Sequence, residues 1–160
     1  PWLLAQADTW IPRRGEDPWC AVLFGPPGTG KSHAATALYR TMMERFDHLQ
    51  GAWLSTDDAI SRIKAEFSSD PEFADTKETM LTVELLLLDD VGRARSTPFS
   101  LELIREVLYK RHLHKRPTIL TSNALKLEDF DAIDPALSDR LRQGTMRFDF
   151  TGLPNRRLGA

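Results

Sequence analysis

The sequence has little of what marks secreted or membrane proteins. Its 160 residues include one cysteine, Cys20, so no internal disulfide can form. Cys20 lies in the apolar run WCAVLF, and we expect a small buried hydrophobic residue there rather than a reactive thiol. We find no apolar stretch long enough to span a membrane and no leader of the signal type. These absences favour a cytoplasmic protein without a membrane partner.

The chain also lacks a strong net charge. A formal charge of -2 gives no overall argument for nucleic-acid binding, but the charges are sorted along the chain. Residues 57–90 carry ten acidic and three basic side chains, whereas residues 93–116 carry seven basic and two acidic ones. Any binding to a polyanion is therefore expected at local patches.

Internal repeats, low-complexity tracts and interdomain linkers are missing as well. The composition, with 41% hydrophobic and 28% charged residues, fits one globular domain over residues 1–160. The chain starts at Pro1 without an initiator methionine, which is compatible with an excerpt that lacks an N-terminal partner-binding domain.

What the sequence does contain is an alternation of short apolar runs with helical patterns. This alternation predicts an α/β fold in which helices wrap a mainly parallel sheet. Strands are expected at residues 19–24, 51–56, 84–89, 117–122 and 145–150. Helices are expected at residues 31–45, at 58–67 with Asp57 or Asp58 as N-cap, at 101–113, and from Pro135 onward.

The stretch GPPGTGKS matches the phosphate-binding pattern G-x-x-x-x-G-K-[ST] between a predicted strand and a predicted helix. Tight glycine turns aim backbone amides at a triphosphate, and the helix N-terminus adds partial positive charge. Lys31 is expected at the β and γ phosphates and Ser32 on Mg²⁺. The predicted nucleotide-binding residues are Gly25, Pro26, Pro27, Gly28, Thr29, Gly30, Lys31, Ser32 and His33.

Two acids follow the apolar run LLLL, at the edge where α/β sheets bind ligands. Asp89 is expected to hold Mg²⁺, and Asp90 to orient and deprotonate the attacking water. The alternative is a solvated strand end or a helix cap. Asn123 ends the next predicted strand, where its amide can hydrogen-bond the γ phosphate or the water; alternatively it only starts a turn.

The order of these motifs resembles the AAA+ ATPases, and more narrowly the DnaC/DnaI helicase loaders and the IstB-type transposition helpers. The segments GPPGTGKSHAATAL, LLLLDDVG, KRPTILTSN and LSDRLRQG carry the resemblance. It implies a three-layer P-loop domain with a five-stranded parallel sheet of order 5-1-4-3-2 and little or no helical lid.

Two departures from the pattern of these families stand out. Asp90 replaces the usual Glu, which puts the rate of hydrolysis in doubt, and Arg156 and Arg157 follow without a sensor 2 helix.

The resemblance also implies an activity and partners. The expected activity is a slow ATPase, using ATP and Mg²⁺ and stimulated by DNA or a partner, that loads a replicative helicase onto single-stranded DNA. Lys31, Asp90, Asn123 and Arg140 are the implied catalytic residues. Arg140 would be a finger acting on a neighbouring subunit, so that the chain forms a homo-oligomer. The alternative for this stretch is a surface ion pair of Asp139 with Arg142.

Three other functions stay open: a transposition helper with a transposase partner, a nucleotide-gated module with little turnover, and a P-loop kinase. Candidate DNA contacts are Arg62, Lys64, Arg93 and Arg95, against the alternative of a solvated charged face. A further basic group, Arg111, Lys115 and Arg116, is equally compatible with snorkelling surface residues. Trp19 and Trp53 are expected in core or interface packing.

Overall fold

A parallel five-stranded sheet forms the middle of the molecule, in the order β2-β3-β4-β1-β5. The computed structural model describes residues 15, 18–66, 75–92, 97–124, 127–132 and 135–156. The strands are β1 Cys20–Phe24, β2 Gly51–Ser55, β3 Leu85–Val91, β4 Thr118–Ser122 and β5 Thr145–Asp149. The helices are α2 Lys31–Arg45, α3 Thr56–Glu66, α4 Thr76–Thr82, α5 Pro98–Leu113 and α6 Pro135–Arg142, with a 3₁₀ helix, η2, at Leu127–Ala132.

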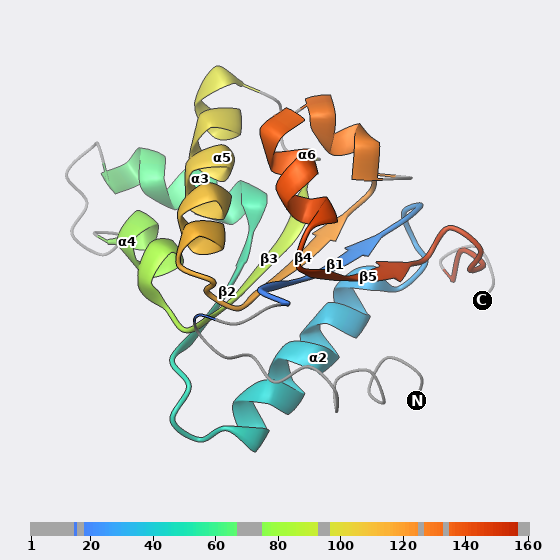
Figure 1. The fold of residues 1–160 in the computed structure, drawn as a ribbon, viewed down its shortest axis with the longest axis horizontal. Coiled ribbons are helices and arrows are strands. Elements are labelled where there is room, and N and C mark those ends of the chain that lie inside the picture. Colours follow the sequence, from blue (N-terminus) through green and yellow to red (C-terminus); the bar gives the residue numbers. More distant parts are fainter. Residues whose placement is uncertain are drawn as a thin grey trace.

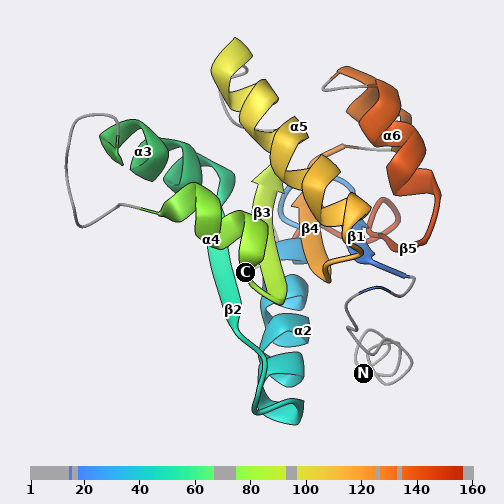
Figure 2. The same ribbon diagram turned by 60° about the vertical axis from the view of Figure 1, so that its left-hand side comes forward.

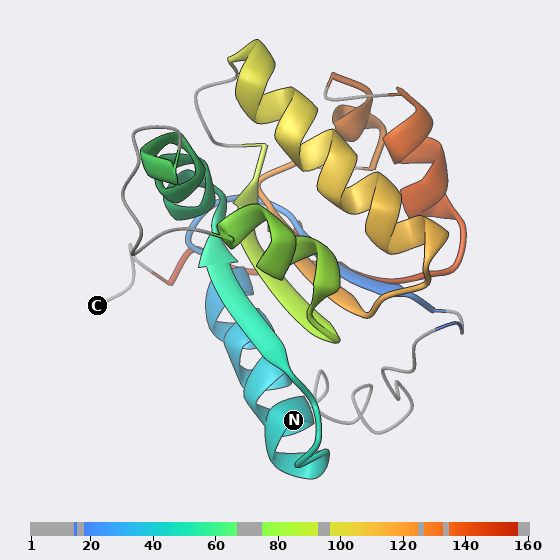
Figure 3. The same cartoon turned by 90° about the vertical axis from the view of Figure 1, so that its left-hand side faces the viewer.

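Helices cover both faces of the sheet, so the expected three-layer α/β fold is confirmed. In Figure 1, α2 lies below the sheet and α3, α4, α5 and α6 lie above it. Figure 3 shows the same layers from the side, with α4 and α5 on the face opposite α2. The strand order is the predicted one read from the other edge. Among the helices of the described residues, none combines the length and apolar character of a membrane span.

Two details of the helices differ from the predictions. The N-cap of α3 is neither of the two predicted acids, because both lie inside its first turn. Instead the Ser55 hydroxyl accepts a hydrogen bond from the amide of Asp58 at 3.0 Å. Helix α4 was not predicted, since seven residues are too few to show a helical period.

The three central strands pack side chains on both faces. In β3, Leu86 and Leu88 join the core cluster under α3 and α5, whereas Leu85 and Leu87 join the cluster against α2. This arrangement is why the strand is apolar throughout. In β1, Cys20 is fully buried, and burial raises the pKa of its thiol, which confirms the expected inert residue.

The two tryptophans of the strand regions have different surroundings. Trp19 is fully buried and packs edge-on against His112, with 5.2 Å between ring centroids. Trp53 lies on the edge strand β2 and is 52% exposed. Core packing therefore holds for Trp19 and is wrong for Trp53, for which interface packing stays a prediction.

Arg111 does not snorkel at the surface. It is fully buried in α5, at the end of the sheet away from the P-loop. Its guanidinium donates to Thr118 Oγ1 at 2.8 Å and to three backbone carbonyls: those of Met80 and Val83 at 2.9 Å and of Pro117 at 2.6 Å. Burial lowers the pKa of Arg111 to about 9, which still leaves the group charged at neutral pH. The side chain joins α4 and α5 to the start of β4.

We predict that Arg111→Met lowers the free energy of unfolding by about 3 kcal/mol, because three carbonyls and a hydroxyl lose their buried charged donor. Urea denaturation measures the change. The matched control is Arg105→Met on the same helix, whose exposed pair with Glu102 is worth less than about 1 kcal/mol. Equal losses in the two variants would contradict the structural role of Arg111.

Candidate functional site

The loop between β1 and α2 has the backbone of a phosphate-binding loop. Gly28 and Gly30 have φ angles of 82° and 94°, in the left-handed region that disfavours residues with a β carbon. A β carbon on Gly28 would lie 2.0 Å from Asn155 Oδ1, so the Asn155 side chain would have to move to accept one. Gly30 is also the N-cap of α2 and has no side chain to occupy the first amides of the helix. Those amides can bind an anion.

Lys31 is buried at the start of α2, and its ammonium joins three segments of the chain. Nζ donates to the carbonyl of Pro26 at 2.6 Å and to Oδ1 of Asn123 at 3.0 Å. Asn123 in turn donates from Nδ2 to Oδ1 of Asp90 at 3.2 Å. One hydrogen-bonded series therefore joins three segments: the ammonium of Lys31 at the start of α2, the amide of Asn123 after β4, and the carboxylate of Asp90 in β3.

A β-bulge at the end of β3 turns Asp90 toward this chain. The register with β4 shifts between Leu88 and Val91, and Asp90 has a φ of 59°. In a regular strand successive side chains alternate between faces. The extra residue lets Leu88 and Val91 join the same core cluster, while Asp90 reaches Asn123.

Thr121, a fully buried residue of β4, holds the bulge in place. Its hydroxyl donates to the carboxylate of Asp89 and accepts from the amide of Asp90, the latter at 2.9 Å. From the other side, the Thr56 hydroxyl donates to the carbonyl of Asp89 at 2.9 Å. Our sequence reasoning missed Thr121; the available signal was a hydroxyl in a strand that is otherwise covered on both faces.

A cavity of about 350 Å³ opens over these groups. Its lining consists of Pro27, Gly28, Gly30, Lys31, Ser32, His33, Asp90, Asn123 and Arg156. All but Arg156 were predicted from the sequence. Of the other predicted nucleotide-binding residues, Thr29 donates from its hydroxyl to the carbonyl of Pro26 at 2.9 Å, so the pair shapes the loop from within. Gly25 packs against Phe150, where a β carbon would lie 2.8 Å from the Phe150 carbonyl carbon.

Arg156 enters the site from the segment after β5. Its amide donates to the carbonyl of Gly28 at 2.9 Å, and its guanidinium lies near Gly30. The sequence singled out Arg156 and Arg157 only for the absence of a helix around them. Residues 151–156 are not helical, yet they bring a cation to the P-loop. Arg157 lies outside the described residues.

The two predicted ligands of Mg²⁺ have the donor chemistry that this ion requires. The Ser32 hydroxyl and the Asp89 carboxylate are hard oxygen donors of the kind that Mg²⁺ prefers. Ser32 lines the cavity, whereas Asp89 is not one of its lining residues and accepts a hydrogen bond from the Thr121 hydroxyl. The two residues fit the ion, and their role as its ligands stays a prediction.

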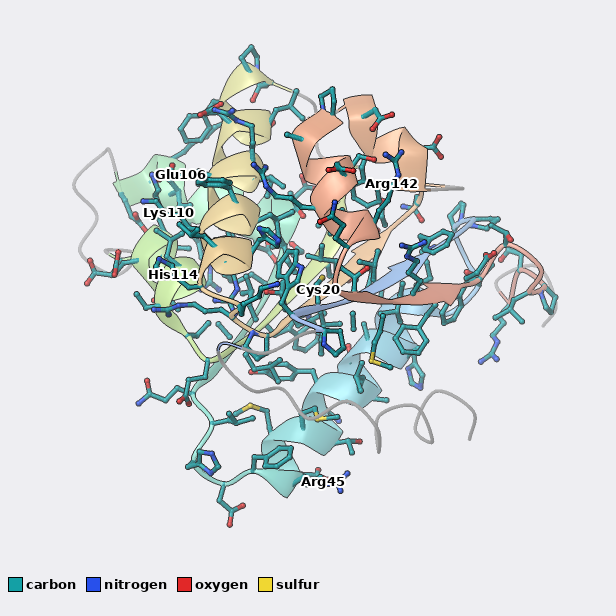
Figure 4. All side chains as sticks on the ribbon, viewed as in Figure 1. Cys20, Arg45, Glu106, Lys110, His114 and Arg142 are labelled. Carbon is teal, nitrogen blue, oxygen red and sulfur yellow. The ribbon has the colours of Figure 1, made fainter. Side chains whose placement is uncertain are left out.

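Arg140 and Arg142 of α6 lie away from the P-loop cavity of their own chain. Arg140 lines a second cavity between α5 and α6, and its guanidinium carbon lies 4.6 Å from the centroid of the Tyr109 ring. Arg142, which is labelled in Figure 4, has Nη2 3.9 Å from the carboxylate of Asp131 in η2. Arg142 thus forms a surface ion pair with Asp131, and the carboxylate of Asp139, its predicted partner, accepts from Gln143 Nε2 at 3.4 Å.

The predicted DNA contacts are only partly described. Arg62 and Lys64 are both exposed on α3. Two positions apart in a helix, they lie on either side of the buried stripe of Ala59, Ile60 and Ile63 rather than on one face. The Lys64 ammonium is 5.9 Å from the centroid of the Phe99 ring. Arg93 and Arg95 lie outside the described residues.

The fold and the site together define an ATP-binding protein of the P-loop AAA+ class. Residues 16–143 match the IstB-like ATP binding protein family, and the chain belongs to that family.

Relatives and solved structures agree with this assignment. The chain is 30% identical over 135 residues to YqaM of Bacillus subtilis, covering 81% of this chain and 42% of that protein. It is 27% identical over 128 residues to the replicative helicase loader DnaC of Escherichia coli, covering 77% and 50%. Thus it spans about half the length of the curated relatives it matches.

Solved structures show the same fold at lower identity. The crystal structure of the DnaC helicase loader superposes with a TM-score of 0.76 at 22% identity, covering 92% of this chain and 85% of the other. For DnaI the TM-score is 0.69 at 20% identity, with coverage of 98% and 81%. The sheet and helices of this chain are therefore arranged as in these two structures.

We predict that Thr121→Val raises the Mg²⁺ concentration for half-maximal ATP turnover by roughly tenfold, because the carboxylate of Asp89 loses the hydroxyl that orients it. A Mg²⁺ titration of phosphate release measures the shift. Thr121→Ser, which keeps the hydroxyl, is the control and should behave like the parent chain. If the valine and serine variants respond alike to Mg²⁺, Thr121 does not orient the metal ligand.

Proposed function

We propose that this chain is the ATPase domain, over residues 1–160, of a protein that loads a replicative helicase onto single-stranded DNA under the control of ATP. The observation that carries the proposal is the hydrogen-bonded chain of Lys31, Asn123 and Asp90 at a P-loop cavity, in a chain homologous to the helicase loader DnaC. ATP binding would set the assembled state and hydrolysis would release the helicase.

The cavity supplies the groups that bind a triphosphate. The amides at the start of α2 and the Lys31 ammonium face the β and γ phosphates, and Arg156 adds a second cation from the same chain. His33 is an exposed polar neighbour at the mouth of the cavity. Ser32 and Asp89 would hold Mg²⁺, which neutralises charge on the phosphates when bound.

Hydrolysis requires a base and a polar group near the γ phosphate. Asp90 is directed into the cavity by the bulge and would accept a proton from the attacking water. Asn123 holds both the Lys31 ammonium and the Asp90 carboxylate, so it can sense whether a phosphate has replaced it as the partner of Lys31. Aspartate is one methylene shorter than the usual glutamate, so we propose slow turnover that DNA or a partner stimulates.

Arg140 would complete the active site of a neighbouring subunit. It lines a cavity other than that of its own P-loop, which supports a role at a phosphate across a subunit contact. Such a head-to-tail contact produces rings or helical filaments of identical chains. The homo-oligomer is thus part of the proposal.

Single-stranded DNA would follow the exposed side of α3. Arg62 and Lys64 project from this helix, whose first residue Thr56 is bonded to the carbonyl of Asp89. A DNA contact on α3 is therefore connected through the backbone to the catalytic bulge. Arg93 and Arg95 follow β3 in the sequence and stay candidate DNA contacts.

A second function is favoured by the family match itself. A transposition helper of the IstB type, delivering a transposase to DNA, would use the same ATP site. A nucleotide-gated module with little turnover remains the alternative that the aspartate at position 90 supports.

We predict that single-stranded DNA stimulates phosphate release, and that the stimulation falls as salt rises because bound cations are released from the DNA on binding. Turnover measured across a salt series, with and without oligonucleotide, provides the test. The variant Arg62→Ala/Lys64→Ala should need more DNA for the same stimulation, whereas Arg40→Ala, an exposed arginine on the opposite face, is the matched control. Indifference to DNA at low salt contradicts both DNA functions.

The partner separates the two DNA functions. Sedimentation of the full protein with purified replicative helicase, in ATP and in ADP, should show a complex that depends on the nucleotide. A complex with a purified transposase in place of the helicase would establish the transposition helper instead.

We also predict complementation between two inactive variants. Lys31→Ala loses its own ATP site but keeps Arg140, and Arg140→Ala keeps its ATP site but loses the finger. Mixed assemblies should recover part of the turnover, since an intact finger then meets an intact site. Phosphate release by each variant alone and by mixtures in several ratios measures the recovery. Mixtures no more active than the separate variants would remove the subunit-crossing role of Arg140.

A further inference from the structure

The cavity between α5 and α6 surrounds the proposed finger. Its volume is about 330 Å³, and its lining consists of Glu102, Arg105, Glu106, Tyr109, Ala136 and Arg140. Figure 2 shows the two helices side by side. Within the cavity the Arg140 guanidinium lies over the face of the Tyr109 ring, at 4.6 Å from its centroid. This distance is well inside the range of a cation–π contact.

Both partners in this contact project from helices that are anchored to the core. In α5, the Thr97 hydroxyl caps the first turn by accepting from the amide of Ser100 at 3.2 Å, and Val107 and Leu108 are fully buried beside Tyr109. In α6, Leu141 is fully buried next to Arg140. The ring therefore has a defined position relative to the backbone that carries the arginine.

The carboxylates of the cavity are engaged with other cations. Glu102 pairs with Arg105 at 2.6 Å, and Glu106 pairs with Lys77 at 2.6 Å and Lys110 at 3.2 Å. The hydrogen bond from Lys77 lowers the pKa of Glu106. Figure 4 shows Glu106 and Lys110 on the same side of α5. Arg140 is thus held against an aromatic face, while the acids of the same cavity form pairs of their own.

An aromatic face suits a finger better than a carboxylate does. Stacking uses the flat side of the guanidinium and leaves its N–H donors along the edge, where they can form paired bonds to phosphate oxygens. It also leaves the positive charge in place, whereas a carboxylate would neutralise it. A long arginine side chain held in this way loses less rotamer freedom when it meets a phosphate.

We propose that Tyr109 is a positioning residue that holds Arg140 in the orientation in which it meets the ATP of the neighbouring subunit. This inference rests on the proposed role of Arg140 across the subunit contact. Tyr109 itself touches neither nucleotide nor the reacting water; it acts on turnover only through the guanidinium that lies over its ring.

The test compares Tyr109→Leu with Tyr109→Phe in steady-state ATP hydrolysis with single-stranded DNA. Leucine removes the ring, and kcat should fall roughly two- to tenfold, the range of a partly exposed cation–π contact, with KM for ATP unchanged. Phenylalanine keeps the ring and should restore kcat. Because Tyr109 is 42% exposed, leucine leaves the core intact. Leu113→Ala, one turn further along α5 and 60% exposed, is the matched control and should match the parent chain.

A double-variant cycle shows whether the effect passes through Arg140. Tyr109→Leu should cause no further loss in a chain that already carries Arg140→Ala. An additive loss, an unchanged kcat or a raised kcat in Tyr109→Leu would overturn the inference. If Arg140→Ala itself leaves turnover unchanged, or the parent chain hydrolyses no ATP, the proposed function fails and the inference with it. Loss in Arg140→Ala alone, with normal Tyr109→Leu, overturns only the role of Tyr109.

Discussion

The arrangement of the candidate ATP site depends on the irregular end of β3. A strand covered on both faces must be apolar along its length, so its polar residues can appear only where it leaves the sheet. A regular continuation would send the Asp90 side chain toward the core under α5. The bulge instead keeps Val91 in that core and turns Asp90 to the P-loop cavity. Thr121 and Thr56 hold the bulge from β4 and α3.

At the opposite end of the sheet, where the strands begin, polar backbone groups also need partners, and a side chain supplies them. Backbone carbonyls where β4 begins and where α4 ends are buried, and the guanidinium of Arg111 supplies their donors. At this end the cation of Arg111 is buried and bonded within the protein. At the P-loop end the cations of Lys31 and Arg156 line a cavity. Both arrangements follow from the requirement that buried polar groups find partners.

Much of this was predictable from local pattern. The five strands, the P-loop and its helix follow from apolar runs and from the glycine spacing that phosphate binding requires. The strand order follows from the family resemblance, and the structure confirms all of these. The sequence failed where a side chain's partner comes from a distant segment. Arg111 looked like one of several surface cations, and Trp53 like a residue of the core or of an interface, because neither burial nor an edge position is visible in a local window.

The sequence by itself determined the fold class and the chemical identity of the candidate phosphate-binding groups, since both depend on short motifs in adjacent elements. Only the tertiary structure decided which groups meet. It brought Arg156 to the P-loop through a hydrogen bond between segments far apart in the chain, and it placed Arg140 on the Tyr109 ring rather than in its own ATP site. Such pairings follow from how helices and turns pack on the sheet, and packing is a property of the whole chain.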